Sequence, residues 1–265
     1  MALPIALQLY SVRYDLEADY YGTLKAVKEM EYDGVELSGL GAHDEKEVKK
    51  MLADLELPIT SSHAPVDELM RDGELERYVE LGCKYIVAGL RFSGDDKETA
   101  HHIETIATLA EKAHKAGLTL NYHNHDFEFK SYKGKYILDT LYETIPADKL
   151  LAQIDTCWVK FAGVDPCEYM LKYAGRMPLL HLKDFIKGEG EDAPYDLIGQ
   201  AENKNKKTDF KFVPLGCGCQ NVPSLLEAGK RCGVNWMIVE QDKSEDRPML
   251  DAAKMSIDYL RSFEW

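Results

Sequence analysis

The sequence has little of what a membrane-embedded, secreted or nucleic-acid-binding protein needs. No window approaches the ~18 apolar residues of a membrane-spanning helix, and the opening MALPIALQLYSVRYD lacks the basic start and long apolar stretch of a secretory signal. The 32 Lys and Arg are outnumbered by 46 Asp and Glu, which gives a net charge of −14. Nucleic-acid binders normally neutralise phosphates with a basic face. We therefore expect a cytoplasmic protein without a nucleic-acid or membrane partner.

Motifs for structural zinc and disulfides are also scarce. Six cysteines are spread over 265 residues, a length that folds without disulfides, so reduced thiols are expected. Cys217 and Cys219 form one close pair, but no second CxC or CxxC completes a four-ligand zinc site. No Pro- or Gly-rich linker interrupts the chain, so we predict a single domain over residues 1–265.

Short apolar runs typical of buried strands recur along the whole chain. They begin at residues 5, 34, 57, 85, 118, 150, 177 and 235, and amphipathic helical stretches lie between them. Apart from the last step, each start follows the previous one by 23 to 33 residues. Eight strand-helix units of about 30 residues are what a (β/α)8 barrel requires. The pattern therefore predicts an α/β protein with a single (β/α)8 TIM barrel.

The last step, from 177 to 235, is longer than the others. The excess falls in a polar segment around residues 186–215, which exceeds an ordinary strand-to-helix loop. We expect a long loop there, and a lid over the barrel mouth is the functional alternative.

Polar and ionisable residues cluster at the carboxyl ends of the predicted strands, where TIM barrels place their chemistry. In LTLNYHNHDFEF (residues 118–129), alternation along the strand lets His123 and His125 share one face. His181 and Lys183 share a face in the same way, as do Glu240 and Asp242. These side chains are predicted to converge at the mouth.

Asp155, His181 and Glu240 end three successive strands, the sixth to the eighth. Their oxygen and nitrogen donors suit one divalent ion such as Mn, Co, Zn or Mg. The alternative is that each side chain satisfies a nearby loop amide or pairs with Lys or Arg.

Several segments resemble the xylose isomerase-like TIM barrels, a group that includes sugar-phosphate isomerase/epimerases. The resemblance covers most of the chain and rests on LQLYSVR, YDGVELSG, YHNHDFEF, the stretch from Gln153 to Asp184, VPLGCGCQNVPSLL and IVEQD. The long stretch is most similar to a bacterial subgroup acting on keto-sugars or 3-keto-glycosides.

The resemblance implies an epimerase site in which Glu, Asp, His and Glu from strands five to eight hold one divalent ion. Asp155, His181 and Glu240 match three of these ligands, and His123 stands where the strand-five Glu is expected. Because the two Glu residues are also the acid/base pair, Glu240 keeps one proton-transfer role here. The second role is open between His125, Glu128 and Lys183.

Hydrogen bonds to substrate hydroxyls are expected from a further set of residues. Glu36, His63 and Asp184 belong to it, with hydrogen bonding at the barrel end as the alternative for the first two. Trp158 could stack on a sugar ring or pack beneath the lid.

The predicted function is thus a metal-dependent sugar isomerase or epimerase that removes a proton next to a carbonyl through a metal-stabilised enediolate. An inosose-type dehydratase and a non-catalytic sugar-binding barrel are the alternatives. The expected partner is a small carbohydrate, and a homo-oligomer is possible on sequence grounds.

Overall fold

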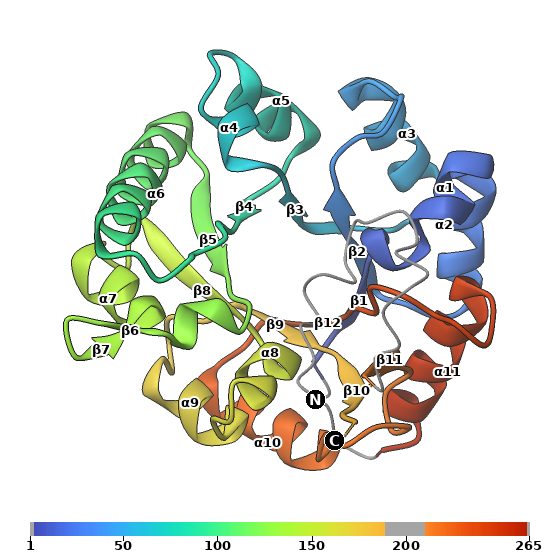
Figure 1. Cartoon of the computed structure of the whole chain (residues 1–265). Coiled ribbons are helices and arrows are strands. Elements are labelled where there is room, and N and C mark those ends of the chain that lie inside the picture. The colour runs from blue at the N-terminus through green and yellow to red at the C-terminus, as the bar shows by residue number, and fades with distance from the viewer. Residues whose placement is uncertain (1–2, 189–209, 264–265) are drawn as a thin grey trace.

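The chain forms a closed barrel of eight parallel strands surrounded by helices, as Figure 1 shows looking into the barrel. The computed structural model describes residues 3–188 and 210–263. Around the barrel the strand order is β1-β12-β9-β8-β5-β4-β3-β2, and every neighbouring pair is parallel. The strands are β1 (Ile5–Gln8), β2 (Gly34–Ser38), β3 (Ile59–His63), β4 (Tyr85–Ala88), β5 (Thr119–His123), β8 (Leu150–Asp155), β9 (Leu179–Leu182) and β12 (Trp236–Val239).

Helices cover the outside of the barrel. They are α1 (Arg13–Ala18), α2 (Tyr20–Glu29), α3 (Glu45–Asp54), α4 (Val66–Leu69), α5 (Glu74–Leu81), α6 (Asp96–Ala116), α7 (Ile137–Thr144), α8 (Thr156–Phe161), α9 (Pro166–Lys172), α10 (Val222–Cys232) and α11 (Met249–Arg261). Short 3-10 turns, η1 (Leu9–Val12) and η2 (Phe127–Phe129), follow β1 and β5. In the described ranges, 3–188 and 210–263, no helix is long and apolar enough to cross a membrane.

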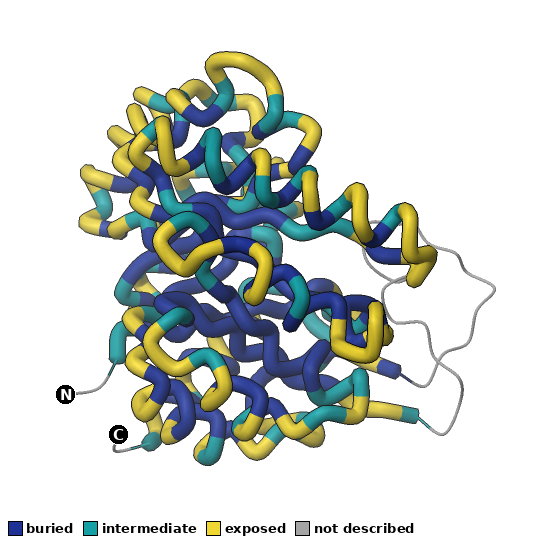
Figure 2. Tube along the Cα trace, turned by 90° about the vertical axis from the view of Figure 1, so that its left-hand side faces the viewer, coloured by how far each residue is buried: buried dark blue, intermediate teal, exposed yellow. Residues whose placement is uncertain are grey.

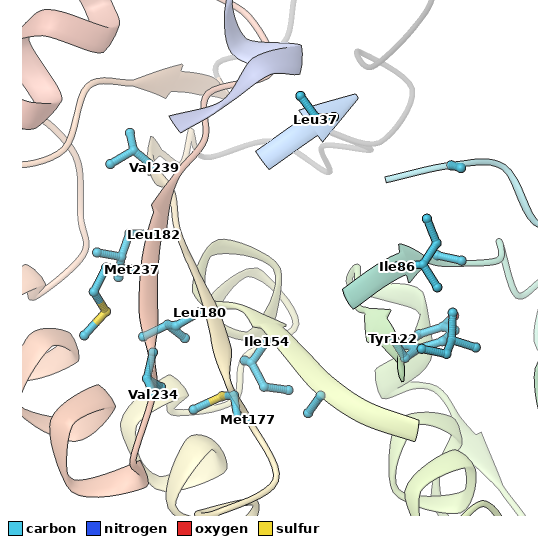
Figure 3. Close-up of a cluster of buried hydrophobic side chains, with 14 of the residues drawn as sticks. Leu37, Ile86, Tyr122, Ile154, Met177, Leu180, Leu182, Val234, Met237 and Val239 are labelled. Atoms are coloured by element: carbon cyan, nitrogen blue, oxygen red, sulfur yellow. The ribbon is translucent and has the colours of Figure 1, made fainter. Parts of the chain in front are cut away.

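The main hydrophobic core lies between the strands and the helices. Leu37, Ile86, Tyr122, Ile154 and Leu180 belong to it, and Figure 3 shows such side chains arrayed along the strands. The tube in Figure 2 is buried along the central strands and mostly exposed on the outer helical turns. This layer removes the apolar side of each strand from water, which is the main stabilising contribution in such a fold.

The inside of the barrel changes from apolar to polar along its axis. A small buried cluster of Ala6, Tyr85, Val87, Leu179 and Ile238 fills the lower part. Two residues further along several of the same strands, the next inward-facing side chains are polar or ionisable. Because side chains two apart share a face, the apolar floor and the polar layer come from the same inward rows.

All eight predicted strands are confirmed, and each begins within two residues of its predicted start. The β5 strand stops at His123, and directly after it the side-chain oxygen of Asn124 accepts a hydrogen bond from the backbone N–H of Asp155 at the end of the neighbouring strand. Most of the predicted loop or lid around 186–215 lies outside the described residues. Its two ends pair as an antiparallel ribbon, β10 (Asp184–Ile186) with β11 (Lys211–Val213). A second ribbon pairs β6 (Ser131–Tyr132) with β7 (Lys135–Tyr136).

Candidate metal centre

Four side chains at the barrel mouth come together as a potential metal-binding group. His123, Asp155, His181 and Glu240 each offer one donor atom, and these atoms all lie within 4.8 Å of one another. His123 ends β5, Asp155 ends β8, His181 lies in β9 and Glu240 directly follows β12. All four residues are buried. The parallel register that pairs Asp155 with His181 brings distant parts of the sequence to one level of the barrel.

The two carboxylate oxygens of Asp155 have different surroundings. It is the N-cap of α8, and its Oδ1 accepts from the backbone N–H groups of Cys157 at 2.8 Å and Trp158 at 3.3 Å. Its Oδ2 has no hydrogen-bond partner in the described part of the chain, although the Lys183 ammonium lies 3.1 Å away. Burial raises the pKa of Asp155, and Lys183 offsets this only in part. Oδ2 therefore shares its one close cation, the Lys183 ammonium, with Glu240 and Asp242.

His181 is held between two carboxylates. Its Nδ1 lies 3.0 Å from Glu240 Oε2, and its Nε2 lies 2.6 Å from Glu36 Oε1. Burial alone would lower the pKa of His181, but Glu36 and Glu240 raise it to about 10. Without a metal the imidazole therefore carries both protons, and ligation through either nitrogen would require that nitrogen to lose its proton.

Lys183 supplies the permanent positive charge of the site. Its ammonium is almost fully buried and lies 2.7 Å from Glu240, 2.8 Å from Asp242 and 3.1 Å from Asp155. Burial would lower the pKa of Lys183, but Asp155, Asp242 and Glu240 hold it well above its ordinary value. Lys183 and His181 in turn hold the pKa of Glu240 well below its usual range, against the effect of burial.

The carboxylates outnumber the cations in this cluster. Glu36, Asp155, Glu240 and Asp242 are all buried, and their nearest positive partners are Lys183 and the protonated His181. Burial raises the pKa of Asp242 to about 6, which is the response expected of a carboxyl without full compensation. An added divalent cation would relieve this excess of negative charge.

The remaining residues that the sequence singled out lie at different depths. His63 is partly exposed and its Nε2 lies 3.0 Å from Glu36, while Glu36 is fully buried beneath the centre. Trp158 is also fully buried, in an aromatic cluster with Phe185 and neighbouring rings. Each therefore contacts the protein on most of its surface.

Asp184 has both oxygens engaged with the backbone. Oδ2 accepts from the N–H groups of Gly216 and Gly218, and Oδ1 accepts from those of Phe185 and Gln220, at 2.9 to 3.1 Å. This residue therefore anchors the turn that precedes α10.

His125 lies beside the centre, with its ring centroid 5.1 Å from that of His123, whereas Glu128 follows on the η2 turn. The His125 ring stacks on Phe127 with centroids 5.0 Å apart, and burial lowers its pKa to about 3. Glu128 is fully buried and accepts from the Tyr122 hydroxyl and from the His125 backbone N–H; burial raises its pKa to about 8. At neutral pH His125 is therefore an uncharged imidazole, and Glu128 is largely the neutral acid.

A cavity of about 470 Å³ adjoins the centre at the ends of β2, β3 and β4. Its lining includes Ser38, His63, Glu68, Arg77 and Tyr78. Its volume lies within the range of small-molecule pockets, and His63 forms a wall shared with the charged cluster.

Sequence reasoning gave Gln153 no role, although it lies two positions before Asp155 on the inward face of β8. Its amide contacts Glu36, His63 and His123. The period-two spacing was the one available signal, because an uncharged glutamine does not stand out among ligand-type residues.

Comparisons with known proteins agree with this architecture. Residues 24–263 match the family described as the xylose isomerase-like TIM barrel. No curated protein sequence matches the chain at a significant level. A sugar phosphate isomerase/epimerase from Parabacteroides distasonis ATCC 8503 superposes with a TM-score of 0.79 at 23% identity, covering 99% of each chain.

Two further solved structures share the fold at lower identity. An L-ribulose 3-epimerase has a TM-score of 0.69 at 16% identity, covering 99% of this chain and 94% of its own. The IOLI protein, solved with a zinc atom, has a TM-score of 0.69 at 13% identity, covering 98% and 97%. These identities establish likeness of fold alone, whereas the family match spans most of the sequence. The chain therefore belongs to the xylose isomerase-like TIM barrel family.

Proposed function

We propose that the protein is a divalent-metal-dependent isomerase or epimerase that acts on a keto-sugar or related polyol. The observation that carries the proposal is the group of His123, Asp155, His181 and Glu240, whose donor atoms lie within 4.8 Å of one another at the catalytic end of the barrel. The likeness to sugar isomerases and epimerases supports the same assignment.

The donor set fits a divalent ion of borderline to hard character. Two imidazole nitrogens and two carboxylate oxygens suit Mn, Co or Zn, and the two oxygen donors also suit Mg. The Oδ2 of Asp155 is buried, and its positive partner, the Lys183 ammonium at 3.1 Å, is shared with Glu240 and Asp242. A bound ion would act as a Lewis acid that polarises a substrate carbonyl and so acidifies the adjacent carbon.

Glu240 is the residue we assign to proton transfer. Its low pKa keeps it ionised, so it can accept a proton at a carboxylate oxygen. Lys183 stays protonated and therefore serves as a charged donor to a developing oxyanion, which excludes it as the base at neutral pH. A pKa of about 3 makes the neutral imidazole of His125 a weak proton acceptor, so we assign it hydrogen bonding to the substrate and leave the second proton-transfer role open.

The substrate would span the charged centre and the adjoining cavity. The reacting carbonyl belongs near the four candidate ligands, while Ser38, His63 and Glu68 offer hydrogen-bonding groups to hydroxyls further along the sugar. Because Glu36 and Asp184 are engaged with protein donors, their contribution to hydroxyl binding would be indirect.

The test is exchange of the substrate α-proton with solvent. We expect metal-supplemented protein in deuterated water to incorporate deuterium into at least one member of a panel of keto-sugars and 3-keto-glycosides, detected by mass spectrometry. Glu240→Gln is expected to abolish the exchange, because the amide cannot accept the proton. Exchange that persists in this variant would remove Glu240 from the mechanism.

Product analysis of the same reactions separates the related chemistries. Return of the proton to the opposite face gives an epimer, return to the neighbouring carbon gives an isomer, and loss of a water molecule identifies dehydration. No exchange with any sugar, together with no gain in Tm on adding Mn, Co, Zn or Mg, would favour a non-catalytic sugar-binding barrel.

A further inference from the structure

We propose that Gln153 is a positioning residue that selects which nitrogen of His123 is available as a ligand. The inference rests on the proposed metal centre for its consequence, but the tautomer it assigns is a property of the metal-free protein. Gln153 is fully buried on β8, between the anchor carboxylate of Glu36 and the two rings of His63 and His123.

The anchor of the network is Glu36, which can only accept hydrogen bonds in its ionised form. Five side-chain groups lie within hydrogen-bonding distance of its two oxygens: Gln8 Nε2 at 2.7 Å, Gln153 Nε2 at 2.6 Å, His181 Nε2 at 2.6 Å, His63 Nε2 at 3.0 Å and the Ser61 hydroxyl. Glu36 is therefore a carboxylate surrounded by donors.

This anchor determines the orientation of the Gln153 amide. If the amide were turned over, its oxygen would lie 2.6 Å from a carboxylate oxygen, a repulsive contact with no proton between them. The amide nitrogen therefore faces Glu36, and the amide oxygen faces the histidines. That oxygen lies 2.9 Å from His123 Nδ1 and 2.8 Å from His63 Nε2.

The orientation of the amide in turn determines the tautomer of His123. An amide oxygen only accepts, so Nδ1 of His123 must carry the proton. With that proton on Nδ1, Nε2 is the ring nitrogen left to bind a metal ion. A neutral imidazole protonated on Nδ1 presents a lone pair at Nε2.

The Nε2 atom is the one that faces Asp155, another of the four candidate ligands. It lies 3.8 Å from Asp155 Oδ2, which is too far for a hydrogen bond. Two ligands that each bind one ion at about 2.1 Å are about 3 to 4 Å apart. The spacing therefore fits a shared cation, and Gln153 makes the correct nitrogen of His123 the donor.

A carboxylate at position 123 would need no such partner, since either of its oxygens can ligate without a choice of tautomer. An imidazole offers one lone pair, and the wrong tautomer would point an N–H at the cation. Gln153 thus belongs functionally with His123, and the two should show coupling when they are changed together.

The experiment combines histidine NMR with metal titration. In metal-free wild-type protein, ¹⁵N spectra of the imidazoles should show His123 as the neutral Nδ1–H tautomer. Gln153→Met keeps the side-chain length and removes the acceptor. We expect it to abolish this preference and to weaken Mn²⁺ binding about 10- to 100-fold, as found for partners of metal-ligating histidines.

Two further variants make the test specific. In a His123→Glu background, Gln153→Met should change Mn²⁺ affinity less than about threefold, because a carboxylate does not depend on a tautomer. Gln241→Met is the matched control, since Gln241 is another buried glutamine whose amide donates to the Lys243 carbonyl at 2.9 Å. It should leave the His123 tautomer as in the wild type.

An Nε2–H tautomer of His123 in the wild-type protein would overturn the proposal without any variant, even if Gln153→Met failed to fold. So would unchanged Mn²⁺ affinity in folded Gln153→Met, or an equal loss in the His123→Glu background. If the wild type bound no divalent ion at all, the proposed function would fail, while the NMR result would still decide the tautomer.

Discussion

Replacing Lys183 by Met should expose how much the buried carboxylates depend on this one ammonium. Lys183 lies within 2.7 to 3.1 Å of Glu240, Asp242 and Asp155, and none of these four side chains is exposed to more than a small extent. Methionine fills a similar volume but carries no charge. The variant would leave the carboxylates facing one another with only the protonated His181 as a nearby cation.

The expected loss follows from the burial of the ion pairs. Removing one partner of a buried salt bridge typically destabilises a protein by about 3–5 kcal/mol, because it leaves an uncompensated buried charge. For a chain of 265 residues, 1 kcal/mol corresponds to about 2 °C in Tm. Lys183→Met should therefore lower the Tm of the metal-free protein by about 6–10 °C at pH 8.

The loss should depend on pH with a defined sign. The pKa of Asp242 is raised to about 6 in the folded protein and would rise further without Lys183. A carboxyl whose folded pKa lies above its unfolded value contributes stability at low pH, and this contribution is lost as the pH rises through the folded pKa. The deficit of the variant should thus be largest near pH 8 and shrink toward pH 5.

Thermal denaturation across this pH range measures both effects. Lys254→Met is the control, because Lys254 pairs with Asp258 on the exposed face of α11 and such pairs contribute less than about 1 kcal/mol. Added Mn²⁺ should raise the Tm of Lys183→Met more than that of the wild type, since the ion replaces the missing charge. A Tm within about 1 °C of the control at pH 8 would refute the charge argument.

Three other predictions concern single side chains. Glu128→Gln should stabilise the protein at pH 8.5 by roughly 1–4 kcal/mol and have little effect at pH 5. The reason is that the pKa of Glu128 is raised to about 8, so the wild type loses stability as this buried carboxyl ionises. Equal urea midpoints for the two proteins at pH 8.5 would contradict this. His123→Ala should weaken Mn²⁺ binding at least about tenfold by calorimetry, and unchanged affinity would assign His123 to packing. Arg176→Met should lower the free energy of unfolding by about 2–4 kcal/mol in chemical denaturation. The Arg176 guanidinium donates to three main-chain carbonyls at 2.5 to 3.0 Å, and the variant loses these hydrogen bonds. A loss below about 0.5 kcal/mol would mean that water replaces them.

The barrel and the convergence of its polar strand ends could be predicted because both depend on local periodicity, whereas the choice of His123 as the fourth candidate ligand came from the family resemblance. A strand about every 30 residues implies the closed parallel sheet, and alternation places His123, Asp155, His181 and Glu240 on inward faces at strand ends. These residues do lie together at the mouth. The register between strands then follows from the barrel itself.

The partners of these side chains could not be predicted in the same way. Asp184 follows Lys183 directly, yet its oxygens bind the turn at 216–220 while the Lys183 ammonium turns to the carboxylates. Which groups each of these side chains contacts depends on side-chain rotamers and on loops distant in sequence. The position of Trp158, fully buried against Phe185, depends on the same tertiary packing.

The ribbon of β10 and β11 has a consequence for redesign of the protein. The chain leaves the barrel through Ile186 and returns through Lys211, and these two residues are cross-strand partners. Their separation is therefore set by main-chain pairing and not by the length of the sequence that joins them. Because loop-closure entropy changes slowly with length, segments of very different size could be grafted between these two points. The barrel thus offers a natural insertion point beside its candidate catalytic centre.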